Sequence, residues 1–283
     1  MMRRFFRRAG SILLAAAMMF SVVACGQSDT GVPETTGEVS TASEESTDAA
    51  ESSAAENNTV QSEETLRVAL MAEPNSLFPL TSSTSESGLV IQNAVGGRLL
   101  EFDASTAEVS PGLAESYELI DETHVRFRLR ENACYSDGTP VTAEDVLYSF
   151  ALAKEHAISF ANYLDIDNSS AEDEHTVVIA MTQYVPGWEQ QFCNPAAVIT
   201  SEANVEAAGG LEAANRNLPL GCGRYVFKEW VSGQYITVER NENYWDDSYN
   251  GYYKTIQFTF VPDAASRVLA LQSGDVNVAQ RIT

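Results

Sequence analysis

The chain has 283 residues, of which 40 are Asp or Glu and 17 are Lys or Arg, so its formal net charge at pH 7 is −23. Binding to nucleic acid requires clustered Lys and Arg against the phosphates, and this composition therefore argues against a nucleic-acid partner. Hydrophobic residues make up 44% of the sequence, which suffices for a buried core in one large or two ordinary domains.

Residues 1–25 have the features of a secretory signal peptide. Four arginines without an acidic residue precede an apolar run from Ile12 to Val23, which is too short for a membrane span of about twenty residues. The run ends in Val22-Val23-Ala24-Cys25-Gly26, which resembles a bacterial lipobox. We expect lipidation at Cys25, which would attach the mature protein to a membrane without spanning it. The alternative is an N-terminal anchor that stays attached, with an ordinary Cys25.

Residues 26–64 are expected to form a disordered acidic tether rich in Ser and Thr. The segment contains ten acidic residues and no aromatic or basic residue, so it cannot build a core. Repulsion between its charges extends it. Such a tether after a lipidated cysteine favours the extracellular face of the cell membrane, on a Gram-positive surface rather than in a periplasm.

Folded structure is expected from about Thr65. Residues 66–70 alternate as a first strand, and the proline-bounded segment 73–80 follows it. A polar loop over residues 81–87 then leads to a helix over residues 89–95.

The most informative run extends from Phe127 to Phe150. Around its start, apolar residues alternate with arginines over residues 125–130, which predicts a strand with one buried and one solvated face. Asp137-Gly138 supplies a turn. Thr142 with Asp145 is close to a capping box and predicts a helix from about Ala143 towards Lys154.

Later elements follow the same two periodicities. Trp188 and Phe192 have helical spacing, and core packing is favoured over ligand stacking for both. A hairpin turn at Ser232-Gly233 joins two alternating runs. The remaining expected elements are a strand over 175–181, the hairpin strands over 226–231 and 235–240, a strand over 256–260, a helix over 264–272 that ends at Gly274, and a strand that begins near Asp275.

The sequence contains no recognisable catalytic or metal-binding motif. Three cysteines outside the lipobox, Cys134, Cys193 and Cys222, allow at most one internal disulfide, and burial as free thiols is favoured. The histidines lack metal-ligand spacing, and no nucleophile elbow, P-loop or dinucleotide fingerprint occurs. We therefore predict no enzyme activity, no cofactor and no metal site.

Several motifs together resemble the signature of the extracellular solute-binding protein family 5, the oligopeptide-, dipeptide- and nickel-type binding components of ABC importers. The run from Leu129 to Phe150 carries its charged strand, DG turn and T-x-E-D-V helix start, and the block from Leu220 to Trp245 resembles a second family segment. The second block departs from the family pattern at Cys222 and Arg224. The resemblance covers residues 65–283.

The resemblance implies a fold class and a domain organisation. The fold is α/β, of the periplasmic-binding-protein-like type II, with two lobes and an inserted extra domain. Residues 65–99 would form the first part of lobe I, residues 100–217 the inserted domain, and residues 218–283 a truncated second part of lobe I. The second lobe would be absent from this chain, and we therefore expect this chain alone not to bind ligand tightly.

The resemblance also implies a function and a set of contact residues. The protein would be a lipid-anchored, monomeric receptor that binds oligopeptides and delivers them to an ABC permease and ATPase complex. The expected ligand contacts are Thr84 and Glu86, in a loop over residues 84–88, and Gln280 and Arg281, at the end of the last strand. Glu86 would meet a cationic group and Arg281 a carboxylate. Alternatives are a same-fold receptor for nickel, haem or oligosaccharide, a surface peptide sensor or adhesin without transport, and a secreted hydrolase.

Overall fold

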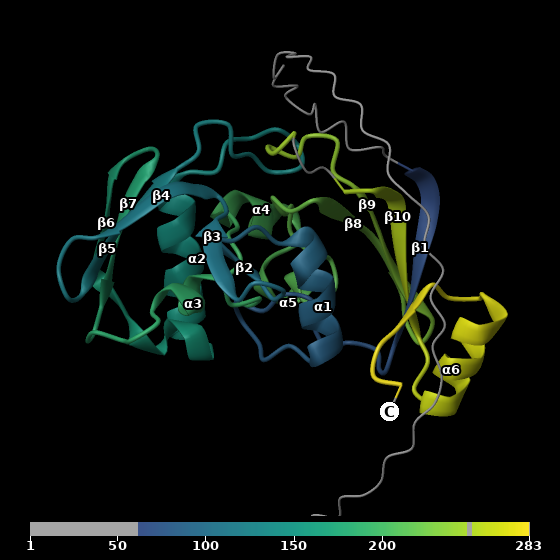
Figure 1. The fold of residues 1–283 in the computed structure, drawn as a ribbon. Helices are drawn as coiled ribbons and strands as arrows, with labels where there is room; N and C mark the ends of the chain where they lie inside the picture. Colours follow the sequence, from purple (N-terminus) through teal and green to yellow (C-terminus); the bar gives the residue numbers. More distant parts are fainter. Residues whose placement is uncertain (1–61, 248–250, 283) are drawn as a thin grey trace, which may run out of the picture. The chain divides into compact units, whose positions relative to one another are not determined.

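The structure is a computed structural model that describes residues 62–247 and 251–282. Its elements are drawn in Figure 1. The helices are α1 (Glu86–Val95), α2 (Ala143–Glu155), the 3-10 helix η1 (Ser159–Tyr163), α3 (Glu189–Phe192), α4 (Glu202–Ala207), α5 (Leu211–Ala214) and α6 (Ala264–Ser273). The strands are β1 (Ser62–Leu70), β2 (Leu100–Asp103), β3 (Glu108–Pro111), β4 (Ala114–Leu119), β5 (His124–Leu129), β6 (Leu164–Asp173), β7 (Thr176–Met181), β8 (Tyr225–Val231), β9 (Tyr235–Arg240), β10 (Tyr253–Phe260) and β11 (Val278–Ala279).

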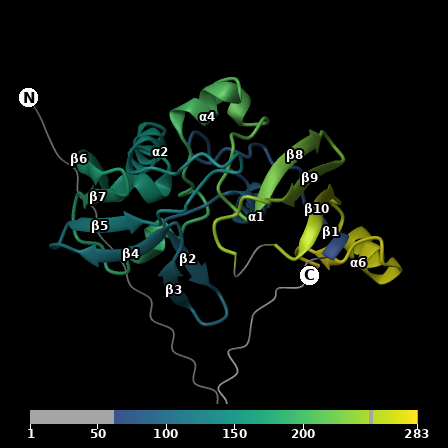
Figure 2. The same ribbon diagram turned by 90° about the horizontal axis from the view of Figure 1, so that it is seen from above.

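A five-stranded mixed sheet contains the first and the last described strands. Its order is β11-β1-β10-β9-β8. Strand β1 runs parallel to both neighbours, so that Val68 lies opposite Phe258 on one side and Val278 on the other. The hairpin of β8 and β9 continues the sheet in antiparallel pairing, as the turn at Ser232-Gly233 predicts. Helix α6 lies beyond β1, on the side of the sheet farthest from β8 (Figures 1 and 2).

A second sheet is antiparallel and has the order β4-β5-β7-β6, and β2 pairs with β3 in a separate hairpin. The predicted alternation of β5 is confirmed, because Val125, Phe127 and Leu129 are fully buried. Its arginines lie on the solvated side and pair with acids of neighbouring segments: Arg126 lies 2.6 Å from a carboxylate oxygen of Glu118. These exposed pairs satisfy the charges and add little stability.

Helix α2 begins as its sequence predicts. The Thr142 hydroxyl accepts a hydrogen bond from the Asp145 backbone N–H, and the Asp145 carboxylate accepts one from the Thr142 backbone N–H. This reciprocal capping box satisfies two of the donors that the first turn leaves without helical partners. Asp145 therefore performs the role for which Glu or Gln is usual.

Two hydrophobic cores pack the helices against the two sheets. The larger packs α2 and α3 against the four-stranded sheet, and the smaller packs Ile91 and Val95 of α1 against the five-stranded sheet. An aromatic cluster lies in the larger core, with the ring centroids of Phe127 and Phe192 4.8 Å apart in an edge-to-face contact. Trp188 joins this cluster, which confirms the predicted core role of Trp188 and Phe192.

The structure corrects several expected boundaries. Strand β1 begins at Ser62, whereas the sequence predicts the strand over residues 66–70 and the disordered tether up to residue 64. Ser62 already pairs with Tyr253 of β10, so the tether cannot extend beyond residue 61. The expected last strand is short: only Val278 and Ala279 form β11. The domain boundaries at residues 99 and 217 stay a prediction.

The three described cysteines are free thiols. Burial raises the pKa of Cys222 to about 12 and that of Cys193 to about 11, so both are protonated and unreactive at neutral pH. The predicted burial is confirmed for these two, whereas Cys134 is only half-buried. No helix within residues 62–247 and 251–282 is long and apolar enough to cross a membrane.

Replacement of Phe127 by Ala tests the larger core. Phe127 is fully buried among Tyr117, Trp188 and Phe192, so the Phe127→Ala variant should lose about 3–5 kcal/mol of unfolding free energy. Phe102→Ala is the matched control, because Phe102 is 46% exposed. Urea unfolding that gives equal losses for both variants would contradict this account of the core.

Candidate functional site

The carboxyl ends of the parallel strands β1, β10 and β11 lie together at one end of the five-stranded sheet. We call this end of the sheet its carboxyl edge. Because β1, β10 and β11 run in the same direction, the segments that follow Leu70, Phe260 and Ala279 emerge side by side. In open α/β sheets, ligands bind outside the carboxyl ends of the strands. This edge is therefore the first place to examine for a site.

Glu86 reaches this edge from a helix start and not from a loop. The expected loop over residues 84–88 is wrong: α1 begins at Glu86, and the Ser85 hydroxyl caps it by accepting a hydrogen bond from the Gly88 backbone N–H. Ser is a favoured N-cap, and an acid in the first turn is stabilised by the positive end of the helix dipole. The helix start thus fixes the direction of the Glu86 side chain.

Three of the four predicted contact residues come together. Arg281 Nε lies 2.9 Å from Glu86 Oε1, and Arg281 Nη2 lies 2.8 Å from Glu86 Oε2, which makes a bidentate ion pair. Gln280 Nε2 donates a third hydrogen bond to the same carboxylate at 3.1 Å. The Gln280 side-chain oxygen accepts from the Met71 backbone N–H, so the cluster joins α1, the end of β1 and the end of β11.

This ion pair is exposed and easily exchanged. The side chains of Arg281 and Glu86 are 64% and 48% exposed, and such surface pairs contribute only about 0–1 kcal/mol. A ligand that offers a carboxylate to Arg281 and an ammonium group to Glu86 therefore replaces the pair at little cost. The arrangement can bind opposite charges, but it holds no group positioned for a chemical reaction.

Thr84 does not join this cluster in the structure. The Thr84 hydroxyl is buried and has no hydrogen-bond partner among the described residues, while its methyl group packs close to Gly88. Cys25, the predicted lipidation site, lies outside the described residues. Both assignments stay predictions.

Glu73 is a residue at this edge that the sequence analysis missed. It follows β1 and accepts hydrogen bonds from Trp230 Nε1 at 2.8 Å, from the Ser232 hydroxyl at 2.9 Å and from the Gly233 backbone N–H at 3.0 Å. Burial raises the pKa of Glu73, but these hydrogen bonds and the charge of Arg216 together lower it below its ordinary value. Glu73 thereby holds the β8–β9 turn against the end of β1.

The lowered pKa of Glu73 predicts a pH dependence of stability. Its contribution is fully present above the unfolded-state pKa, near 4.5, and is lost as the pH falls through the lower folded-state pKa. Glu73→Gln should therefore cost roughly 1–2 kcal/mol at pH 7 and less at pH 3, as measured by urea unfolding. Glu122→Gln, at an exposed position, is the control. A Glu73→Gln cost that is the same at both pH values would contradict the prediction.

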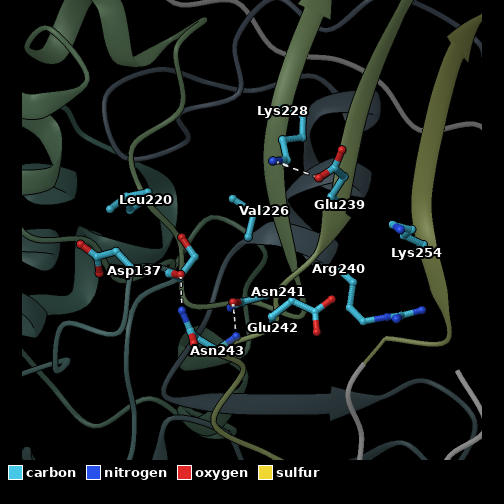
Figure 3. Close-up of a pocket in the computed structure, with 11 residues that line it drawn as sticks. Asp137, Leu220, Val226, Lys228, Glu239, Arg240, Asn241, Glu242, Asn243 and Lys254 are labelled. Carbon is cyan, nitrogen blue, oxygen red and sulfur yellow. Dashed lines mark hydrogen bonds and ion pairs between the residues drawn. The ribbon is translucent and has the colours of Figure 1, made fainter. Parts of the chain in front are cut away.

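A pocket of about 380 Å³ lies at the opposite edge of the same sheet, where β8 and β10 begin and β9 ends (Figure 3). Its lining is charged and polar, but contacts within the protein occupy several of these groups. Lys228 pairs with Glu239 at 2.9 Å. The Asn243 amide donates to the Ser136 carbonyl at 2.9 Å, which joins the turn before Gly138 to the segment after β9. We interpret this pocket as a joint between segments and not as the ligand site.

Within the described residues, no group of three or more His, Cys, Asp or Glu side chains is arranged to hold a metal ion. The histidines are dispersed: His124 contacts Asp121 on an exposed turn, and His175 lies between β6 and β7. At the carboxyl edge of the sheet, the opposite charges of Glu86 and Arg281 are therefore the groups that we consider for ligand binding.

Comparisons with known proteins show the family to which the chain is similar. Residues 108–283 match the family model of the bacterial extracellular solute-binding proteins, family 5. The periplasmic oligopeptide-binding protein OppA of Salmonella typhimurium is 33% identical over 193 residues, which cover 60% of this chain and 34% of the relative. The oligopeptide-binding protein AppA of Bacillus subtilis is 29% identical over 222 residues, which cover 75% of this chain and 40% of the relative.

A solved structure supports the same relationship. The binding protein AgaA from A. tumefaciens R10, in complex with agropinic acid, superposes with a TM-score of 0.69 at 28% identity and covers 77% of this chain and 44% of its own. The predicted type II α/β fold is therefore confirmed, and the chain spans less than half the length of these relatives. The matched family consists of binding proteins and not of enzymes.

Proposed function

Because this chain belongs to the bacterial extracellular solute-binding proteins of family 5, we propose that it is the ligand-binding component of an ABC importer and that it takes oligopeptides. The observation that carries the proposal is the exposed pair of Glu86 and Arg281 at the carboxyl edge of the sheet. A peptide has an ammonium group at one end and a carboxylate at the other. Glu86 is therefore a partner for the ammonium end of a peptide, and Arg281 is a partner for a carboxylate.

The bound ligand needs a second surface. On this chain the cluster is open to solvent, where a charged contact is weak. In a two-lobed receptor, closure removes water from the ligand and strengthens these contacts, and the closed state is what a permease recognises. The relatives named above are more than twice as long as their matched segments. We assign residues 62–282 to one side of the cleft and its inserted domain.

The cellular arrangement follows from the N-terminal sequence. Lipid on Cys25 would hold a monomeric receptor at the extracellular face of the membrane, on a Gram-positive surface, and residues 26–61 would let the folded part move away from the bilayer. A permease and an ATPase would be its partners. Globomycin inhibition or Cys25→Ala, followed by membrane fractionation, tests the anchor: retention of the Cys25→Ala protein in the membrane fraction would refute it.

Calorimetric titration tests the ligand class. A form of the protein that includes both lobes should bind unmodified peptides of three to five residues with micromolar or tighter affinity, whereas residues 26–283 alone should bind them much more weakly. Nickel, haem and an oligosaccharide complete the panel, and preferential binding of any of them would replace the peptide assignment. Peptide binding without peptide uptake, in cells that lack neighbouring permease genes, would favour a surface sensor or adhesin.

Glu86→Gln tests the assignment of the charges. The variant keeps the side-chain shape but removes the charge, so affinity for a peptide with a free amino end should fall about tenfold, the size of one charge-assisted hydrogen bond. The same peptide with an acetylated amino end should bind both proteins equally. Glu118→Gln, which removes an exposed acid of the four-stranded sheet, should leave both affinities unchanged. An equal loss for free and acetylated peptides would place the amino end elsewhere.

A further inference from the structure

Arg267 of α6 is buried at the edge of the sheet where the candidate site lies. It is the only charged residue of α6, and it is 4% exposed. Its guanidinium donates hydrogen bonds to four backbone carbonyl oxygens, those of Val261 at 2.7 Å, Pro262 at 2.8 Å, Gln280 at 2.8 Å and Arg281 at 2.6 Å.

These contacts explain why a guanidinium is needed there. Burial of a charge costs several kcal/mol unless hydrogen bonds satisfy it, and the planar fork of Arg presents five donors in fixed directions. Two of the acceptors follow β10 and two follow β11. The side chain therefore links the ends of the two strands that α6 connects.

The segment that Arg267 holds has an unfavourable backbone. Arg281 has φ = 44°, in the left-handed region, which is unfavourable for a non-glycine residue. The preceding backbone N–H of Gln280 donates to the Ala69 carbonyl at 2.9 Å. The two carbonyls bound by Arg267 fix the chain on either side of the strained position, and this conformation directs the Arg281 side chain towards Glu86.

We infer that Arg267 is a positioning residue for the ligand-contacting side chains of Gln280 and Arg281. It touches only their backbone, so it acts through the backbone conformation of residues 280 and 281, which we call the corner. The ligand role of the corner rests on the function proposed above. The positioning itself is a property of the unliganded chain and is measured without ligand.

Arg240 supplies a matched control. It is also a buried arginine, at 7% exposure, and it donates to the Gly251 and Tyr252 carbonyls at 2.9 Å each. It lies at the opposite edge of the same sheet, at the end of β9. Arg240→Met therefore removes a comparable buried guanidinium without touching residues 280 and 281.

The test uses NMR on the chain, with two signals that report the corner. In Arg267→Met, hydrogen exchange of the Gln280 backbone amide should accelerate at least tenfold, the effect of losing one charge-assisted hydrogen bond. The Arg281 Nε–Hε signal should move to the position that it takes in Glu86→Gln, where its acceptor is altered directly. Arg240→Met should change neither signal. If Arg267→Met does not fold, Arg267→Lys is measured in its place, because it keeps the charge but loses the planar guanidinium with its five donors.

Two results would overturn the inference. One is a folded Arg267 variant in which the Gln280 exchange rate and the Arg281 signal both match the wild type. The other is acceleration by the same factor at amides of β9, which would mean that Arg267 contributes only general stability. If peptides fail to bind the wild-type protein, the proposed function fails, while these ligand-free measurements still decide the role of Arg267.

Discussion

The parallel pairing of β1 between β10 and β11 is the constraint on which the rest of the structure depends. Parallel neighbours cannot be joined by a tight turn, so each requires a crossover. Between β1 and β10 the crossover contains the whole four-stranded sheet and the hairpin of β8 and β9, whereas between β10 and β11 it is α6 alone. Because the three strands point the same way, Glu73, Gln280 and Arg281 all emerge at one edge, where the start of α1 brings Glu86 to meet them.

Local chemistry predicted most of the secondary structure. Residues 125–129 alternate because one side of β5 faces the core, and Thr142 with Asp145 encodes a helix start within four residues. The loop expected around Glu86 is wrong because the Ser85 hydroxyl caps a helix that begins at Glu86. The family motifs, which combine several such local signals, were enough to identify the fold.

The candidate site was only partly predictable, because its contacts are not local. Glu86, Gln280 and Arg281 are each predicted to contact a ligand. In the structure, Glu86 and Arg281 form an ion pair with each other across a separation of 195 residues. Glu73 looks like any solvated acid in the sequence, although it holds a turn more than 150 residues away. The sequence does hold a signal for Arg267, because a single charge in an otherwise uncharged helix indicates that the charge has a specific partner.

The same pairing of β1 determines the order in which the protein can fold. Arg67 and Asn277 hydrogen-bond across a separation of 210 residues, and contacts between such distant residues form late because a long loop must close first. Strand β1 emerges from the ribosome before both of its neighbours and acquires them only after residues 253–279 have been made. The five-stranded sheet therefore cannot be completed around β1 until β11 has been made.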